Sequence, residues 1–139
     1  MPGKYILAVD QSTQGTKAIL VDHNNQIFYK VALPHKQLVN NQGWVSHDLD
    51  EIRHNLYQLF RNILKKVNPD QIEALAITNQ RESAAAWSRH TGEPLCHTIV
   101  WQDNRTEKLI NRIAYPELKE TVKNKTGLAL SPQNGAGCY

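Results

Sequence analysis

The chain has 139 residues, enough for one modest domain whose core buries roughly two thirds of the surface exposed by the unfolded chain. Its 16 basic and 13 acidic residues give a formal charge of +3, too small an excess to indicate a nucleic-acid partner. No apolar stretch approaches the roughly 20 residues that a membrane span requires, and no apolar leader precedes the first strand that the sequence predicts. We therefore expect neither a nucleic-acid partner nor a membrane partner.

Cysteine and histidine content gives no sign of a metal site. Cys96 and Cys138 have no metal-like spacing and are too few for a disulfide framework. We expect reduced thiols in a cytoplasmic protein, with Cys96 as a small apolar filler. The histidines also lack metal-binding spacing, and we expect most of them at the surface: His23, His35, His47, His54, His90 and His97.

A short polar turn lies between two apolar runs near the N-terminus. Residues 5–9 are typical of a strand, and residues 16–21 alternate as a paired strand does. The hydroxyls and N–H groups of the turn can converge on one phosphate, and an aspartate at its mouth can hold Mg2+ directly or through water. The residues concerned are Asp10, Ser12, Thr13, Gly15 and Thr16. Taken alone, the segment fits an ordinary polar hairpin equally well.

The next segments predict the start of a layered α/β fold. Residues 23–25 link the second strand to a third, 26–33, which gives three antiparallel strands. A polar connection follows, and then Asp48 and Glu51 stand three apart as in a capping box. They precede a helical stripe of apolar residues: Ile52, Leu56, Leu59, Phe60, Ile63, Leu64 and Val67.

Turn residues at 68–70 end this helix and lead into a fourth strand. Residues 88–92 predict a hairpin-like excursion, and helices are expected over 106–114 and 117–125, with Gly127 near the C-terminal cap. The order β-β-β-α-β is that of an RNase H-like layer with a mixed sheet, here incomplete. No linker, repeat or low-complexity tract divides the chain.

Two later strand ends carry groups suited to binding hydroxyls. The apolar run 72–77 leads into residues 78–82, whose amide, guanidinium and carboxylate groups hydrogen-bond the neighbouring hydroxyls of a polyol or sugar. A second run leads into residues 101–105, which begin with a tryptophan. The guanidinium and carboxylate could instead form a surface ion pair, and the tryptophan could be core. Three polar strand ends in one short chain favour a shared sheet edge that carries a site.

These segments, in this order, resemble the beginning of the FGGY family of carbohydrate kinases, within the actin, hexokinase and sugar-kinase fold group. The similarity extends along essentially the whole chain, through residues 10–18, 43–48, 77–82, 99–106 and 126–128. It is greatest toward the glycerol kinases of that family. It implies an RNase H-like N-terminal domain and ATP-dependent phosphorylation of a sugar or polyol hydroxyl, with Mg2+.

Family members are far longer, and their catalytic base and adenosine site lie beyond Tyr139. We therefore expect residues 1–139 to be a truncated N-terminal part of the family's N-terminal domain, inactive as a kinase by itself and able to form homo-oligomers. The alternative is a non-catalytic binding or structural module of the same fold.

The resemblance also implies a nucleotide side of the site. Asp10 would help to anchor magnesium, and Ser12, Thr13 and Lys17 would meet the nucleotide phosphates. Lys17 lies in a strand, where residues alternate between faces, so phosphate contact and solvent exposure are equally open for it.

On the acceptor side, the pocket would be lined by Arg81, Glu82 and Trp101. Weaker candidates are Gln102, Asp103, Arg105 and Gln133, and for Asp103 we expect capping of the following helix instead. Gln133 stands where glycerol kinases usually carry a tyrosine that helps to hold glycerol. This departure favours another polyol or sugar as substrate.

Overall fold

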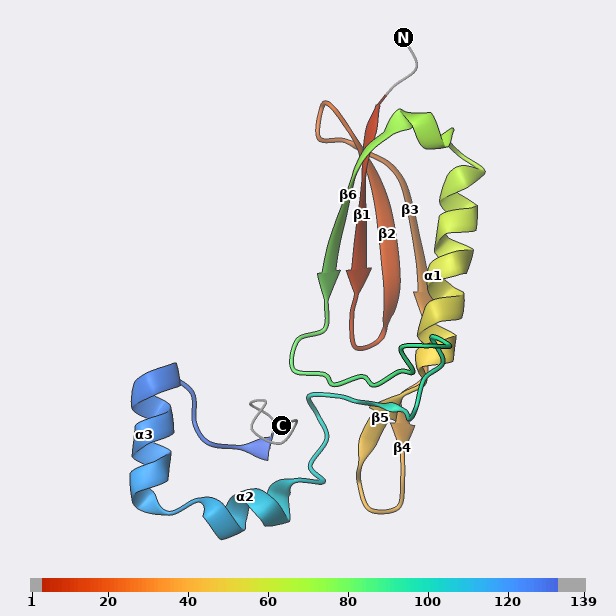
Figure 1. The fold of residues 1–139 in the computed structure, drawn as a ribbon. Coiled ribbons are helices and arrows are strands. Elements are labelled where there is room, and N and C mark those ends of the chain that lie inside the picture. The colour runs from red at the N-terminus through yellow and green to blue at the C-terminus, as the bar shows by residue number, and fades with distance from the viewer. Residues whose placement is uncertain (1–3, 133–139) are drawn as a thin grey trace. The chain divides into compact units, whose positions relative to one another are not determined.

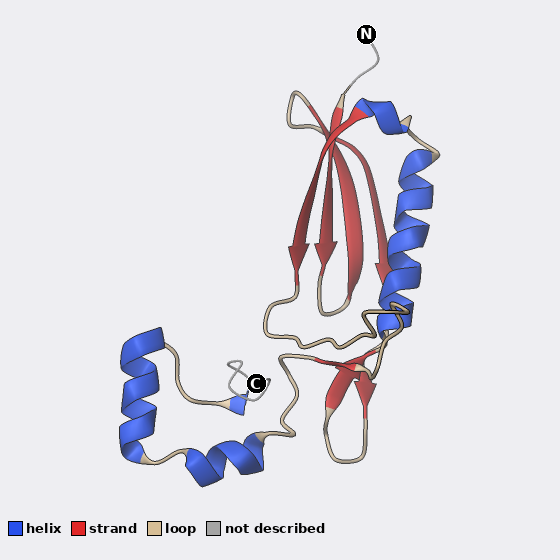
Figure 2. Ribbon diagram, in the orientation of Figure 1, coloured by secondary structure: helices blue, strands red, loops and turns tan. Residues whose placement is uncertain are grey.

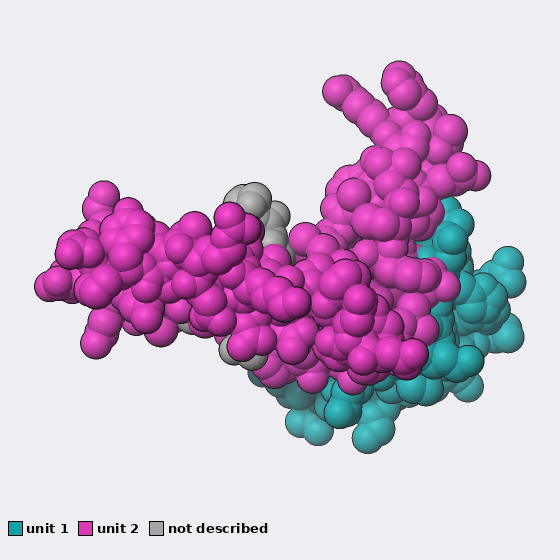
Figure 3. All heavy atoms as spheres, turned by 90° about the horizontal axis from the view of Figure 1, so that it is seen from below, with its two compact units in different colours: residues 1–36, 50–80 teal, residues 37–49, 81–139 magenta. Residues whose placement is uncertain are grey.

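A computed structural model describes residues 4–132, which form two compact units (Figure 3). Unit 1 comprises Met1–Lys36 and Asp50–Gln80, and unit 2 comprises Gln37–Leu49 and Arg81–Tyr139. Each unit is built from two separate stretches of chain, so no single linker divides them.

Unit 1 is a four-stranded mixed sheet with one long helix beside it (Figure 1). Strands β1 (Tyr5–Gln11), β2 (Gly15–Asp22) and β3 (Ile27–Pro34) are antiparallel neighbours, as predicted. Strand β6 (Ile72–Asn79) pairs with β1 in parallel, which gives the order β3-β2-β1-β6. The predicted mixed sheet of an α/β layer is confirmed.

Helix α1 (Leu49–Leu64) covers one face of this sheet. Apolar residues recur at the helical period in α1 and at every second position in the strands, so each element has one apolar face to pack against the other. Leu7 and Val9 point to the same side of β1 and pack with Leu59 and Ile63 of the helix. All four side chains are buried, together with Ala18, Leu20 and Val67. The predicted helical stripe is therefore the core-facing stripe, apart from Leu64, which is exposed.

The chain leaves α1 through a short 3-10 helix, η1 (Pro69–Gln71). Asn68 accepts a hydrogen bond from the Asp70 backbone N–H, and the Gln71 side chain accepts one from the Asn68 N–H. This reciprocal capping sets the direction in which the chain enters β6.

Unit 2 contains a small three-stranded sheet and two helices (Figure 2). Strands β4 (Leu38–Val39), β5 (Val45–His47) and β7 (Thr98–Ile99) are antiparallel in the order β4-β5-β7. Helices α2 (Glu107–Ile113) and α3 (Pro116–Thr126) confirm the two predicted helices, and Gly127 ends α3 in the left-handed conformation. The excursion near residue 90 is closed by a bridge between Trp87 and Pro94.

The β4–β5 hairpin was not predicted, since the segment between β3 and α1 was expected to be an irregular polar connection. Its strands have two and three residues, too few to show an alternating pattern. Cys96 was expected as a core filler and is exposed instead. Within residues 4–132, none of the helices combines the length and apolar character needed to cross a membrane.

Candidate active site

The C-terminal ends of β1 and β6 lie at the same edge of the unit 1 sheet because the two strands are parallel. Asp10 is the sheet neighbour of Thr78, and Gln11 is the neighbour of Asn79. The Gln80 backbone N–H donates to the Gln11 carbonyl oxygen at 2.7 Å. Two of the three polar strand ends predicted from sequence therefore lie side by side.

The third strand end does not lie at this edge, and that part of the prediction is wrong. Strand β7, which leads to Trp101, belongs to the second sheet, where Ile99 pairs with Ser46. With two residues, β7 gave no sequence signal for its pairing partner, and β5 was itself unpredicted.

The β1–β2 turn is closed by its own hydrogen bonds. The backbone N–H and the hydroxyl of Ser12 both donate to the Gly15 carbonyl oxygen, at 3.0 and 2.9 Å. Thr16 is fully buried, and its hydroxyl donates to the side-chain oxygen of Gln11. Ser12 and Thr13 remain partly exposed, so this ordered turn presents polar groups to solvent.

Asp10 and Lys17 are directly opposite each other in the β1–β2 pair, on the face of the sheet away from Leu7 and Val9. The Lys17 Nζ lies 3.9 Å from Asp10 Oδ2, and both side chains are well exposed. Lys17 thus extends beside the aspartate at the mouth of the turn, where a bound phosphate would find a positive charge.

The accessible carboxylate of Asp10 beside the turn is a suitable ligand for Mg2+. Mg2+ is usually bound by one or two carboxylates, with water and phosphate oxygens completing the octahedron. Asp10 supplies one accessible carboxylate of this kind. Among the residues that the structure describes, no group of three or more His, Cys, Asp or Glu side chains could hold a metal ion by itself.

Arg81 and Glu82 follow Gln80 directly along the chain, and both are exposed. Among the described residues, Arg81 and Glu82 form no ion pair with each other, so the alternative of a surface ion pair is wrong. Glu82 has a φ of 56°, in the left-handed region that residues with a side chain seldom adopt. Such strained positions concentrate at functional sites.

Trp101 is 44% exposed, so it is not part of the core that the described residues form. The backbone of Ala84 bonds to that of Ile99 in both directions, at 2.8 and 3.0 Å. This bridge pairs Ala84, two residues after Glu82, with Ile99, two residues before Trp101. The three predicted acceptor residues therefore lie on two segments that the fold joins within unit 2.

Asp103 does not cap α2, so that expectation is wrong. The N-cap is Thr106, and its side chain makes no capping hydrogen bond. Asp103 is buried and accepts hydrogen bonds from the Val45 N–H at 2.7 Å and from the backbone N–H, Nε and Nη2 of Arg105 at 2.8–3.0 Å. It thereby joins the end of the β4–β5 hairpin to the segment after β7.

The ionisation of Asp103 reflects two opposed effects. Burial disfavours the charged carboxylate, but the hydrogen bonds from Arg105 and Val45 together with the Arg105 charge outweigh it, and the pKa of Asp103 lies below the ordinary 3.8. The weaker candidate Gln102 accepts a hydrogen bond from the Gln37 amide. Gln133 lies outside the described residues.

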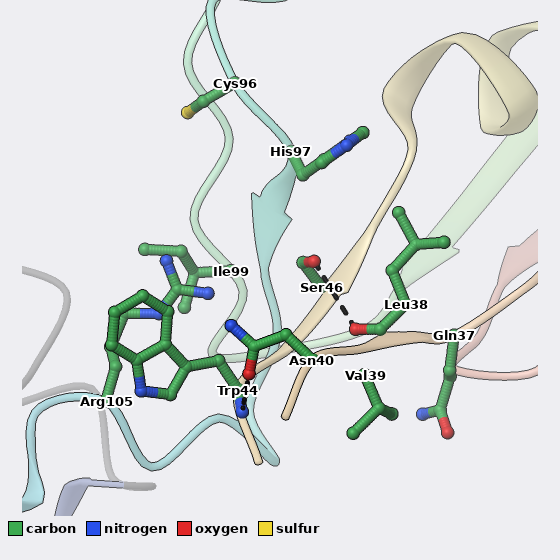
Figure 4. Close-up of a pocket in the computed structure, with 10 residues that line it drawn as sticks. All are labelled: Gln37, Leu38, Val39, Asn40, Trp44, Ser46, Cys96, His97, Ile99 and Arg105. Atoms are coloured by element: carbon green, nitrogen blue, oxygen red, sulfur yellow. Dashed lines mark hydrogen bonds between the residues drawn. The ribbon is translucent and has the colours of Figure 1, made fainter. Parts of the chain in front are cut away.

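A hollow of about 620 Å3 lies in unit 2 beside the small sheet (Figure 4). The Arg105 guanidinium stacks over the Trp44 ring, with its carbon 4.9 Å from the ring centroid. The lining residues include Arg105 and none of Arg81, Glu82 and Trp101: Gln37, Leu38, Val39, Asn40, Trp44, Ser46, Cys96, His97, Ile99 and Arg105. The three main predicted acceptor residues are therefore not part of this hollow, whereas the weaker candidate Arg105 lines it.

Two buried histidines were missed by reasoning from sequence. His35 and His47 are 8% and 2% exposed, whereas the other four histidines are exposed as expected. His35 directly follows β3, and its Nε2 lies 3.1 Å from the Thr13 carbonyl oxygen in the turn. In the sequence, His35 shows only that it follows Pro34 at the end of a predicted strand, which does not reveal its contact with the β1–β2 turn.

The sheet, the turn and the polar strand ends agree with comparisons to known proteins. The family model of the FGGY carbohydrate kinases, N-terminal domain, matches residues 5–137. The chain therefore belongs to the FGGY family of carbohydrate kinases, as its motifs predict.

Curated relatives include glycerol kinase 1 of Thermotoga maritima, 42% identical over 130 residues, and glycerol kinase of Staphylococcus haemolyticus, 39% identical over 131 residues. These alignments cover 92% and 93% of this chain but 26% of each relative. The chain thus spans about a quarter of the length of the curated relatives it matches.

Solved structures give the same result. Plasmodium falciparum glycerol kinase with ADP is 36% identical with a TM-score of 0.80, over 93% of this chain and 26% of that one. A gluconate kinase from Lactobacillus acidophilus has a TM-score of 0.83 at 22% identity, over 94% of this chain and 26% of that one, and shows the shared fold alone. The predicted fold group is confirmed.

Proposed function

We propose that the whole protein transfers a phosphoryl group from ATP to a hydroxyl of a polyol or sugar, and that residues 1–139 supply the phosphate turn and part of the acceptor site. The observation that carries this proposal is the ordered Ser12–Gly15 turn beside Asp10 and Lys17, at the edge where β6 leads into Arg81 and Glu82. The family and its glycerol kinase relatives support the same reaction class.

When bound, MgATP supplies the phosphoryl group, with the metal neutralising phosphate charge. The residues of this chain act by positioning and by charge. Asp10 would hold the metal, directly or through water, and Thr13 and Lys17 would donate to phosphate oxygens. The Ser12 hydroxyl would join them by turning from the Gly15 carbonyl oxygen to the phosphate when the nucleotide binds. Lys17 is close enough to Asp10 to balance charge when no phosphate is present.

On the acceptor side, Glu82 accepts hydrogen bonds from substrate hydroxyls and Arg81 donates to their oxygens. The exposed ring of Trp101 offers an apolar wall to the C–H face of the substrate. Gln102, Asp103 and Gln133 contribute less. Asp103 is already occupied by Arg105 and Val45, so its role in our proposal is to shape unit 2.

Two substrate classes are favoured by different observations. The curated relatives at about 40% identity are glycerol kinases, which favours glycerol. Gln133, in place of a tyrosine that helps to hold glycerol in that branch, favours another polyol or a sugar. We place the protein in the cytoplasm, where ATP is plentiful and the exposed Cys96 stays reduced.

The complete gene product should be assayed with MgATP against glycerol, longer polyols, pentoses and hexoses. ADP release that depends on one acceptor class confirms the reaction and names the substrate. ATP turnover that no acceptor stimulates, or no turnover with any acceptor, rejects the proposal. Replacing Gln133 with Tyr should raise kcat/KM for glycerol relative to larger acceptors.

A further inference from the structure

We propose that His35 is a positioning residue for the phosphate turn, holding the turn carbonyls away from the bound anion. The inference rests on the proposed function, because the anion is the nucleotide phosphate. His35 contacts neither phosphate nor acceptor in this proposal. It acts on the turn from the protein side.

Two hydrogen bonds join His35 to the turn. Its Nε2 lies 3.1 Å from the Thr13 carbonyl oxygen, and its backbone N–H donates to the Gln14 carbonyl oxygen at 3.3 Å. Because a carbonyl oxygen only accepts, the imidazole carries its proton on Nε2. His35 is only 8% exposed, and hydrogen bonds of buried groups are stronger than in water.

The effect on anion binding follows from the geometry of the peptide unit. Carbonyl oxygens repel a phosphate and N–H groups attract it, and the two point in opposite directions across each planar peptide. Thr13, Gln14 and Gly15 each have a carbonyl that accepts a hydrogen bond from within the chain. Fixing the Thr13 carbonyl with the imidazole therefore fixes the direction of the Gln14 N–H.

His35 can hold the turn because its own neighbours are tied to α1. The buried side chain of Asn55 donates to the Pro34 carbonyl oxygen at 2.9 Å, and the Lys36 N–H donates to Glu51 Oε2 at 3.1 Å. Figure 1 shows the end of β3 next to the first turns of α1. Residues 34–36 thus connect the turn to helix α1.

The test uses three substitutions in the complete protein. His35→Phe removes the donor and keeps a ring, His35→Gln keeps a donor at the ε nitrogen, and His54→Phe changes an exposed histidine on α1. Loss of one neutral hydrogen bond predicts a KM for MgATP raised roughly fivefold to tenfold in His35→Phe. The KM for the acceptor should be unchanged, His35→Gln should recover most of the affinity, and His54→Phe should match the wild type.

A second readout does not depend on activity. Amide hydrogen exchange at residues 12–16, measured without nucleotide, should be faster in His35→Phe and near the wild-type rate in His35→Gln. Equal behaviour of these two variants, or an equal rise in both KM values, would overturn the inference. If His35→Phe does not fold, His35→Asn replaces it. The Asn side chain has one methylene fewer than that of Gln, so its amide does not reach the Thr13 carbonyl oxygen.

The two proposals fail in different ways. A wild-type protein with no acceptor-dependent turnover rejects the kinase function, while the exchange measurement still decides whether His35 holds the turn. Normal turnover with unchanged exchange in His35→Phe rejects only the role of His35.

Discussion

Glu82 combines an exposed carboxylate with a left-handed backbone, and folding alone does not favour the second of these features. A residue with a side chain held at such a φ costs roughly 1–3 kcal/mol unless the surrounding structure enforces it. We infer that the conformation aims the carboxylate and is retained for that reason. Glycine would relieve the backbone but would remove the hydrogen-bonding group.

We predict that Glu82→Ala in the complete protein lowers kcat/KM for the acceptor by about a hundredfold, the equivalent of roughly 3 kcal/mol for a lost charge-assisted hydrogen bond. Steady-state kinetics with the acceptor varied will measure it. Glu93→Ala, at another exposed glutamate, is the control. An unchanged kcat/KM in Glu82→Ala would reject the acceptor assignment.

For Asp10, we predict a loss on the nucleotide side alone. Asp10→Asn keeps the size of the side chain but offers Mg2+ an amide oxygen, which is a poorer ligand for a hard cation. Turnover should need more magnesium, while acceptor affinity measured by calorimetric titration stays near the wild-type value. A large loss of acceptor affinity with normal magnesium dependence would contradict the division of roles.

Asp103 gives a prediction of pH dependence. Its pKa is lowered in the folded state, so its contribution to stability is present above the ordinary pKa near 3.8 and is lost as the pH falls through the lower folded pKa. Asp103→Asn should reduce the free energy of unfolding by about 3 kcal/mol near neutral pH, because Arg105 loses its buried partner.

Urea unfolding of the purified chain between pH 7 and pH 2.5 will test this. The difference between wild type and Asp103→Asn should shrink as the solution becomes more acidic. A difference that stays constant with pH would show that the carboxylate charge is not the stabilising feature.

At the scale of the elements, Gly15 is required by the approach of β3 to β2. A Cβ built at Gly15 would lie 2.6 Å from the Leu33 carbonyl oxygen and 3.1 Å from the Pro34 Cα, both backbone atoms that cannot turn aside. We predict that Gly15→Ala destabilises the chain by roughly 1–3 kcal/mol. Gln14→Ala, at the exposed tip of the same turn, should be nearly neutral, and thermal unfolding of both variants will compare them.

The sequence predicted the elements that have a long periodic signal. The three N-terminal strands, α1 and the two late helices all contain runs long enough to show a period of two or of 3.6. The short strands β4 and β5 contain two and three residues and carry no such signal. The strand that leads into Trp101 was predicted from its apolar run, but β7 is too short to indicate which sheet it joins.

The site was predictable to the same extent. Asp10 lies at the end of a strong strand signal, and the parallel pairing of β1 with β6 places it beside Thr78. Ser12 and Thr13 follow in the turn that the sequence predicted. The position of Asp103 was not predictable, because its partner Val45 belongs to a strand without a period. The contact of His35 with Thr13 likewise depends on tertiary structure alone.

At the scale of the whole molecule, β6 leaves apolar surface uncovered. Leu75 and Ile77 are 52% and 70% exposed, although they are sheet neighbours of the buried Leu7 and Val9. Within residues 4–132, β6 has a strand on one side only, so its other edge can accept a further strand. This is the surface through which we expect copies of the 139-residue chain to associate.

We predict that the isolated chain does not phosphorylate any acceptor and self-associates at micromolar concentration. A half-site cannot align the phosphoryl group with the attacking oxygen. Light scattering should show oligomers in the wild type and fewer in Ile77→Lys, which places a charge on the exposed apolar surface of β6. Robust turnover by the isolated chain, or a monomer at high concentration, would contradict this prediction.

The parallel pairing of β1 with β6 also has a consequence for the order in which the chain folds. Leu7 and Leu75 are neighbours in the sheet although β2, β3 and α1 all lie between them in the chain. During synthesis, β1, β2 and β3 can form their local hairpins while β6 is still inside the ribosome, because closing short loops costs less entropy than closing long ones. We therefore expect the β1–β2 turn to form early. Strand β6, which leads to Arg81 and Glu82, can pair with β1 only after it has left the ribosome.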